Sequence, residues 1–274
     1  SEDEAGSLYL PEGYYNTSGT QWRQESATLL PGADRSNVNL TLLTGSTISG
    51  TVSLPTGISA PDGGIYIDVY VYDTYRDNYY SNRTVFVPAG QNSANYTLAV
   101  PNDASASWQI FYFYYAEEGT NLEHCLREGY YSSTGTQWRD DLATPVQGGV
   151  DWSSINLTLL LGKTISGIAS PPPGLPFDDG VDIDVCAVND LVRYQWIYCD
   201  YIGVASDSAG EAYKVTVPQD AAVSWTVRYE LDLQSTLDNP NNFLRTGYYS
   251  TRCTQWRSSL ATPVQGGVDR SGID

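Results

Sequence analysis

The stretch GYYSSTGTQWR, residues 129–139, occurs in two further versions, GYYNTSGTQWR from Gly13 and GYYSTRCTQWR from Gly247. An active site needs its residues once, whereas a building unit needs them once per unit, so this repetition predicts tandem domains. Flanking sequence repeats with it: STISGTVSL at 46–54 matches KTISGIASP at 163–171. The phrase ATPVQGGVD stands at 143–151 and again at 261–269.

The unit between two phrases has the pattern of short β-strands. In Ile65–Asp73, apolar side chains at every second position alternate with Tyr66, Asp68 and Tyr70, which is typical of a half-buried strand. Gly, Pro, Asn and Asp cluster between such segments. We expect seven strands per unit, which for the first unit are 47–53, 64–72, 84–88, 94–100, 107–115, 122–131 and 155–161. This pattern predicts an all-β chain of tandem seven-stranded immunoglobulin-like β-sandwiches.

Several of these segments resemble a known family. TISGTVSLPTG, IYIDVYVYD, YTLAVP, the GYY phrase and GGVD followed by INLTLL are together similar to the carboxypeptidase regulatory-like repeat. That β-sandwich recurs in tandem in bacterial and archaeal surface proteins. The resemblance covers nearly the whole chain and implies a fold and an extracellular setting, with no catalytic residues to carry over.

The repeats divide the chain unevenly. Residues 45–161 form a first sandwich domain, and residues 162–274 form a second one without its final strand. The N-terminal segment 1–44 matches only the tail of a unit and carries a strand, 38–43, that has no sheet of its own. We expect the chain to be a processed product or a piece of a longer one.

An unpaired strand and an open sandwich edge both favour association. One hypothesis is β-strand complementation, in which 38–43 of one subunit completes the second domain of the next, with Val38, Leu40 and Leu42 at the interface. Repeated head to tail, this contact makes a homopolymer, and the chain is then a structural subunit of an extracellular filament or surface array. The alternative is a repeat piece of a cell-surface adhesin or carbohydrate-binding stalk, cut out of register.

The two domains differ on the outward face of the fifth strand. The second domain has Arg228 and Glu230 there, and the first has Phe111 and Phe113. Aromatic side chains also face outward on another strand of the first domain, namely Tyr66, Tyr70 and Tyr72. Three readings stay open: a subunit interface, local cover by a loop or the N-terminal segment, and a platform on which sugars stack.

Cysteines and glycosylation sequons agree with an exported protein. Cys186 and Cys199 lie 13 residues apart in neighbouring strands, and we expect a disulfide between them. Cys125 and Cys253 lack local partners; they either pair with each other or across a boundary, or Cys253 stays free. Five Asn-x-Ser/Thr sequons, consistent with a glycoprotein or with repeat inheritance, stand at Asn16, Asn39, Asn82, Asn95 and Asn156.

Charge and motifs exclude several function classes. The net charge of −18 opposes binding to nucleic acid, and no run of 18 apolar residues predicts a membrane span. A single histidine, His124, and the lack of a metal or phosphate-loop motif argue against an enzyme. We expect no cofactor. Two carboxylate groups leave weak Ca²⁺ binding or glycoside hydrolysis as open alternatives, namely Asp178, Asp179, Asp182 and Asp184, and the pair Asp62 and Asp68.

Overall fold

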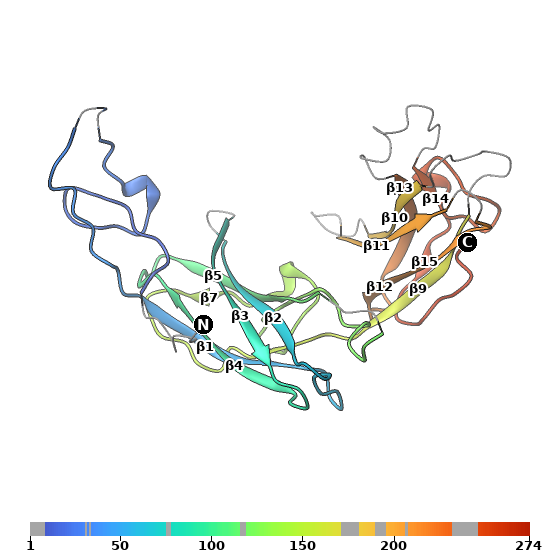
Figure 1. Cartoon of the computed structure of the whole chain (residues 1–274), viewed down its shortest axis with the longest axis horizontal. Helices are drawn as coiled ribbons and strands as arrows, with labels where there is room; N and C mark the ends of the chain where they lie inside the picture. The colour runs from blue at the N-terminus through green and yellow to red at the C-terminus, as the bar shows by residue number, and fades with distance from the viewer. Residues whose placement is uncertain are drawn as a thin grey trace. The chain divides into compact units, whose positions relative to one another are not determined.

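The computed structural model describes residues 9–30, 32, 34–74, 78–115, 119–170, 181–189, 196–205, 208–231 and 246–274. In this part of the chain the regular structure is β-strand, with single turns of 3-10 helix at Gln24–Ser26, Asp140–Leu142 and Ser258–Leu260. The predicted all-β class is therefore confirmed. The described residues contain no helix that could span a membrane. The chain folds into two compact units, Ser1–Glu123 with Arg127–Leu160, and His124–Leu126 with Leu161–Asp274 (Figure 1).

Domain 1 (45–161) is a sandwich of two sheets. Strands β1 (Ser46–Ser53), β4 (Ser93–Val100) and β8 (Leu157–Thr158) form one sheet in the order β4-β1-β8. The other sheet has the order β3-β2-β5-β6, with β7 also paired to β5. Its strands are β2 (Ile65–Asp73), β3 (Asn78–Val87), β5 (Ser107–Phe113), β6 (Glu128–Tyr130) and β7 (Val146–Gln147). Ile48, Val52, Ile67, Ile110 and Leu157 are fully buried between the sheets.

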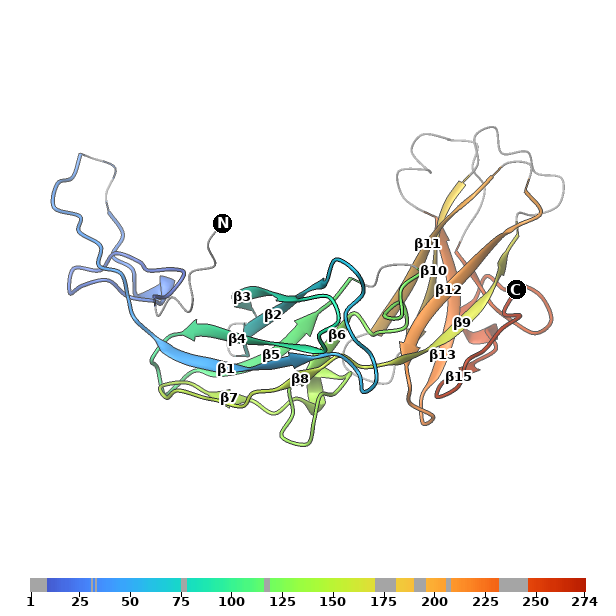
Figure 2. The same ribbon diagram turned by 60° about the horizontal axis from the view of Figure 1, so that its bottom comes forward.

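Domain 2 (162–274) repeats this plan with one strand fewer among its described residues. Strands β9 (Gly162–Ala169) and β12 (Glu211–Pro218) form a two-stranded sheet that corresponds to β1 and β4. The larger sheet has the order β11-β10-β13-β14, with β15 paired to β13 (Figure 2). Its strands are β10 (Val181–Asn189), β11 (Trp196–Val204), β13 (Ser224–Leu231), β14 (Gly247–Tyr248) and β15 (Val264–Gln265). No described strand of domain 2 corresponds to β8.

The repeated phrase builds the same loop three times. Tyr130 and Gln137 exchange two backbone hydrogen bonds of 2.7 and 2.8 Å, and Tyr14 with Gln21 and Tyr248 with Gln255 do the same. The phrase glycine allows close packing, because a Cβ on Gly129 would lie 2.2 Å from Cε1 of Tyr112, and one on Gly247 would lie 2.2 Å from Cε1 of Tyr229. The glycine of the phrase therefore lets the loop pack directly against the tyrosine ring of the fifth strand in each sandwich.

The cysteines are partly as predicted. Cys186 and Cys199 face each other across β10 and β11 and form a disulfide, which confirms that pairing. The alternative bond between Cys125 and Cys253 is absent, since both are free thiols. Cys125 is buried and forms an isolated backbone β-bridge with Leu161, next to the start of domain 2. Burial raises the pKa of its thiol to about 12. Cys253 is exposed.

We predict that the variant C186S/C199S destabilises domain 2. The bridge closes a 13-residue separation, and such a loop constrains the unfolded chain by about 3 kcal/mol. Urea unfolding of the oxidised full chain, followed by circular dichroism, should show a transition that moves to lower urea in the variant. The variant C253S, which removes an exposed free thiol, is the control and should leave the transition in place. An unchanged midpoint in C186S/C199S would contradict a stabilising role.

Candidate functional site

The last strand of domain 1 shows what closes a sandwich of this type. Strand β8 runs parallel to β1, with Leu157 opposite Val52 and Thr158 opposite Ser53. The side chains of Leu157 and Leu159 are 0% and 1% exposed. Three backbone N–H groups are satisfied: Leu159 donates to the Ser53 carbonyl at 2.8 Å, Thr158 to Oγ1 of Thr136 at 2.7 Å and Leu160 to the Tyr112 hydroxyl at 2.9 Å.

The last described residues of domain 2 make the first contacts of the same closure. In domain 1, Ile155 N donates to the Ser49 carbonyl at 3.0 Å, and the Thr51 N–H donates to Oδ1 of Asn156 at 3.0 Å. In domain 2, Ile273 N donates to the Ser166 carbonyl at 3.2 Å, and the Ile168 N–H donates to Oδ1 of Asp274 at 2.8 Å. Ile273 and Asp274 thus take the places of Ile155 and Asn156. The positions of Leu157 to Leu160 come next.

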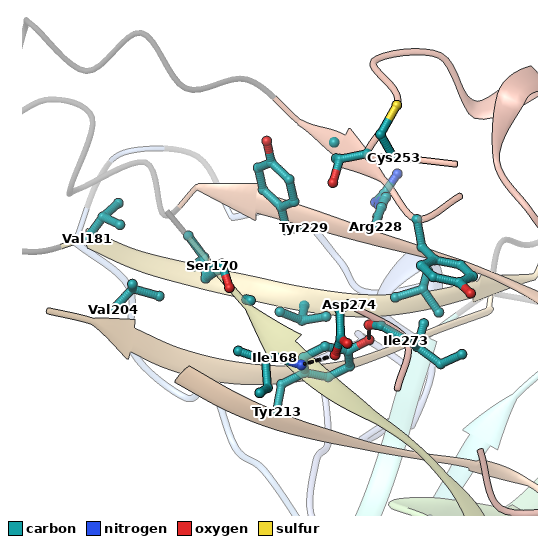
Figure 3. A pocket seen from close by; sticks show the side chains of 17 residues that line it. Ile168, Ser170, Val181, Val204, Tyr213, Arg228, Tyr229, Cys253, Ile273 and Asp274 are labelled. Carbon is teal, nitrogen blue, oxygen red and sulfur yellow. Dashed lines mark hydrogen bonds between the residues drawn. The ribbon is translucent and has the colours of Figure 1, made fainter. Parts of the chain in front are cut away.

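A groove of about 530 Å³ lies at those positions in domain 2. Its lining comes from both sheets and is mostly apolar, with Ala169, Val185, Val227 and Tyr213 among its members. Figure 3 shows Asp274 and Ile273 at the groove with the Asp274 carboxylate against Ile168, and the side chains of Val181 and Val204 beside it. The groove therefore occupies the space that Leu157 and Leu159 fill in domain 1.

Polar groups at the groove are also those that β8 uses. Thr254 corresponds to Thr136, and Tyr229 corresponds to Tyr112, and both line the groove. Burial raises the pKa of Tyr229, so its phenol stays neutral at physiological pH. Cys253 lies next to Thr254 with its Sγ at the edge of the groove (Figure 3). The groove therefore presents acceptors for backbone N–H groups as well as apolar walls.

The segment 38–43 is the exposed counterpart of the buried closing strand. It lies in no sheet, and Val38, Leu40 and Leu42 are 38%, 61% and 73% exposed. Their equivalents in domain 1, Ile155, Leu157 and Leu159, are 2%, 0% and 1% exposed. Thr41 N donates to Oγ1 of Thr20 at 2.7 Å, and Leu10 N donates to the Leu43 carbonyl at 2.8 Å. The segment therefore keeps the hydrogen bond of a closing strand to the phrase threonine, while its apolar side chains are exposed.

The N-terminal phrase also contacts domain 1 through its last two residues. Arg23 forms an ion pair with Asp103, at 2.6 Å between Nη2 and Oδ2, and donates to Oγ of Ser105 at 2.9 Å. The ring of Trp22 lies 6.1 Å from that of Trp108 and 6.0 Å from that of Tyr80. Burial acts to raise the pKa of Asp103, but hydrogen bonds from Ser105 and Arg23 outweigh it and lower that pKa to about 2.

The predicted aromatic face is one surface, since β2 and β5 are neighbours in the same sheet. Phe111 stacks on Tyr70 at 5.2 Å and on Tyr130 at 5.3 Å and is only 6% exposed. Phe113 packs against Tyr115 and lies under the guanidinium of Arg127, 5.2 Å from its centre. Tyr66 is 67% exposed. Neighbouring aromatic rings of the same domain thus cover Phe111, and an interface at this face stays a prediction.

The other predicted sites fall on the surface or outside the described residues. The sequon residues Asn39, Asn82, Asn95 and Asn156 are exposed, whereas Asn16 is half-buried and donates to the Ser26 carbonyl. Asp178 and Asp179 lie outside the described residues. Among the described ones, no three His, Cys, Asp or Glu side chains gather as a metal site would require. Glycan attachment and Ca²⁺ binding stay predictions.

Comparison with known proteins identifies no family. No protein-family profile and no curated protein matches the chain, so the carboxypeptidase regulatory-like resemblance stays an expectation. Solved structures with some likeness include a candidate cell adhesion protein from Parabacteroides distasonis, at 10% identity over 69% of this chain and 76% of that one, with a TM-score of 0.29. A candidate adhesin from Bacteroides ovatus is 8% identical over 82% and 86%, with a TM-score of 0.27.

A leucine-rich repeat protein from Bacteroides thetaiotaomicron is 14% identical over 83% of this chain, with a TM-score of 0.25, and the chain spans 25% of its length. At such scores the similarity supports no inference about function. Any role of the groove, of the segment 38–43 and of the Arg23 contact therefore has to be inferred from their geometry alone.

We predict that the Arg23 contact controls the titration of Asp103. Because the folded-state pKa is lowered from 3.8 to about 2, the stabilisation is fully present above pH 3.8 and is lost as the pH falls through 2. In R23A the pKa of Asp103 should rise towards its ordinary value, since a charge-assisted donor is gone. NMR titration of the Asp103 side-chain carboxyl between pH 2 and 5 measures this. R252A, at an exposed arginine of domain 2, is the control; the same midpoint in R23A and wild type would contradict the contact.

Proposed function

We propose that this protein is a structural subunit of an extracellular filament, assembled by strand complementation between neighbouring copies. The segment that contains Leu40 and Leu42 in one copy enters the groove of domain 2 in the next. The donor and the groove belong to different surfaces of the chain, so the contact is heterologous and repeats head to tail. The observation that carries the proposal is the match between the open groove of domain 2 and the exposed segment 38–43.

The match extends to each feature of the natural closing strand. Leu40 and Leu42 stand where domain 1 has Leu157 and Leu159 and would bury their side chains in the same way. Each buried leucine contributes about 1.5–3 kcal/mol. The N–H groups of Thr41 and Leu43 would meet Thr254 Oγ1 and the Tyr229 hydroxyl, as Thr158 and Leu160 meet their counterparts in domain 1. These gains act against the loss of translational and rotational freedom on association.

The hydrogen bonds of domain 2 limit which residues of the donor segment can enter the groove. Ile273 and Asp274 already hold the positions that correspond to Val38 and Asn39. A donor strand that keeps them in place therefore inserts Leu40 to Leu43, and Val38 lies at the point where the two chains meet. Val38 was predicted as an interface residue; in this register it contributes less than the two leucines.

Two chemical features of the chain support an extracellular setting, namely a disulfide and exposed glycosylation sequons. The disulfide between Cys186 and Cys199 needs an oxidising compartment to form and persist. Four of the five sequon asparagines are exposed, as glycan attachment requires. These features support an exported protein.

We predict that the variant L40D/L42D abolishes assembly of the chain. Two carboxylates in an apolar groove would lose their hydration without a compensating partner. Both leucines are exposed in a single copy, so the variant should fold as the wild type does. Light scattering after size-exclusion chromatography and electron microscopy should show filaments for the wild type and single copies for the variant. The matched control is L29D, at a leucine of the same N-terminal segment that is 91% exposed.

A cross-linking experiment tests the register separately. Cys253 is exposed beside Thr254, and Cys125 is buried, so a cysteine at Thr41 gives a second reactive thiol. A short thiol-to-thiol cross-linker should join T41C to Cys253 of another copy and produce covalent ladders, which C253S should remove. If the wild type stays single at high concentration, or L40D/L42D still forms filaments, the proposal is wrong. If residues that follow Asp274 in a longer chain close the groove, the wild type should stay single at high concentration.

A further inference from the structure

The phrase of domain 2 presents the same Trp–Arg pair that the N-terminal phrase uses on domain 1. The guanidinium of Arg257 lies 4.1 Å from the centre of the Trp256 ring, and Arg23 lies 4.6 Å from that of Trp22. Trp256 is 70% exposed, and Arg257 is exposed as well. Trp22 and Arg23, by contrast, are half-buried against domain 1.

The two pairs are carried by loops with the same internal hydrogen bonds. Thr28 N donates to the Tyr15 carbonyl at 2.8 Å, and Thr262 N donates to the Tyr249 carbonyl at 2.9 Å. A single 3-10 turn follows the arginine in each loop, at Gln24–Ser26 and at Ser258–Leu260. Trp256 and Arg257 are therefore already arranged like a pair that is seated on domain 1.

One hydrogen bond fixes where this loop lies relative to the closing strand. In domain 1, the N–H of Thr158 donates to Oγ1 of Thr136, and in the N-terminal segment, Thr41 donates to Oγ1 of Thr20. When Thr41 enters the groove of another copy, its N–H meets Thr254 instead of Thr20. The loop 247–257 of the acceptor then stands beside the donor strand in the place that the loop 13–23 held.

We propose that assembly exchanges the two pairs: Trp256 and Arg257 of the acceptor copy replace Trp22 and Arg23 on domain 1 of the donor copy. This inference rests on the proposed function, because strand insertion brings the two surfaces together. The seat is Asp103 with Ser105 and the rings of Trp108 and Tyr80. The N-terminal pair is thus an internal competitor that covers the seat in a single copy.

The charges around the seat suit either arginine. Asp103 is the direct partner of Arg23, and Asp73 of domain 1 also favours its charged form. Glu25, 3.6 Å from Nη1 of Arg23, belongs to the N-terminal loop and leaves the seat with it. Arg257 has the same charge and the same guanidinium geometry, so it can take over both bonds of Arg23. The exchange replaces the contacts with Asp103 and Ser105 within one chain by the same contacts between chains, as in domain swapping.

The test compares R257A with R23A, which delete the same side chain from the two competing pairs. R257A removes the contact that forms on assembly and should raise the concentration needed for filament formation by about 3- to 10-fold. R23A removes the competitor and should lower that concentration or shorten the lag before growth. R252A, at an exposed arginine of the same phrase, is the control and should behave as the wild type. Sedimentation of filaments over a concentration series provides the measurement.

The outcomes separate this inference from the proposed function. If R23A weakens assembly as much as R257A, or if both match the wild type while L40D/L42D abolishes filaments, the exchange is wrong and strand insertion survives. If the wild type forms no filaments, both fall. A folding defect is checked by circular dichroism, and because both arginines lie outside the sandwich cores, the spectra should match that of the wild type.

Discussion

The closing strand is the interaction on which the sandwich depends. Leu157 and Leu159 fill the space between the two sheets of domain 1, and no other described segment of that domain reaches these positions. Their backbone is held by β1, by Thr136 and by Tyr112, which belong to three different parts of the fold. A sandwich without this strand therefore loses core packing and backbone pairing together. The groove of domain 2 lies at the corresponding positions.

The repeated phrase is the second half of this closure. Its glycine lies against the tyrosine of the fifth strand, and its threonine hydroxyl accepts a hydrogen bond from a backbone N–H of the closing strand. The phrase and the closing strand therefore pack together as one unit, although about 20 residues separate them in sequence. The described residues of the N-terminal segment include both the phrase and the strand-like segment 38–43. The described residues of domain 2 include the sandwich and the phrase, with no described strand in the groove.

Much of the sandwich could be predicted from alternation, because its long strands are half-buried. Strands β1, β2 and β4 begin and end within a residue of the predicted ranges, and β5 ends two residues early. Strand β3 begins at Asn78, six residues before the predicted range 84–88. The prediction was weaker where pairing is short: the expected strands 122–131 and 155–161 contain only Glu128–Tyr130 and Leu157–Thr158, and Val146–Gln147 was missed. These segments are held by side-chain acceptors such as Thr136 and Tyr112, and alternation carries no signal for such contacts.

The site was predictable in part for the same reason. Comparison of repeats predicted the segment 38–43 outside a sheet, and the structure places these residues in no sheet. The comparison did not reveal that Ile273 and Asp274 make the contacts of Ile155 and Asn156, since that depends on individual hydrogen bonds. It also treated Phe111 as exposed, whereas Tyr70 and Tyr130 stack on both sides of it. Cross-strand neighbours become visible only when register is known.

Repetition also determines which contacts can drive assembly. The Trp–Arg pairs of the first and third phrases are chemically alike, so the proposed exchange would leave the number of bonds to Asp103 and Ser105 unchanged. The net gain must come from surfaces that are open in a single copy, which are the groove and the side chains of Leu40 and Leu42. In this proposal the Trp256–Arg257 pair orients an incoming copy on domain 1, and its N-terminal counterpart competes for the same residues. A chain built from repeats can in this way hold its own assembly surface closed with a duplicate of the surface that later binds there.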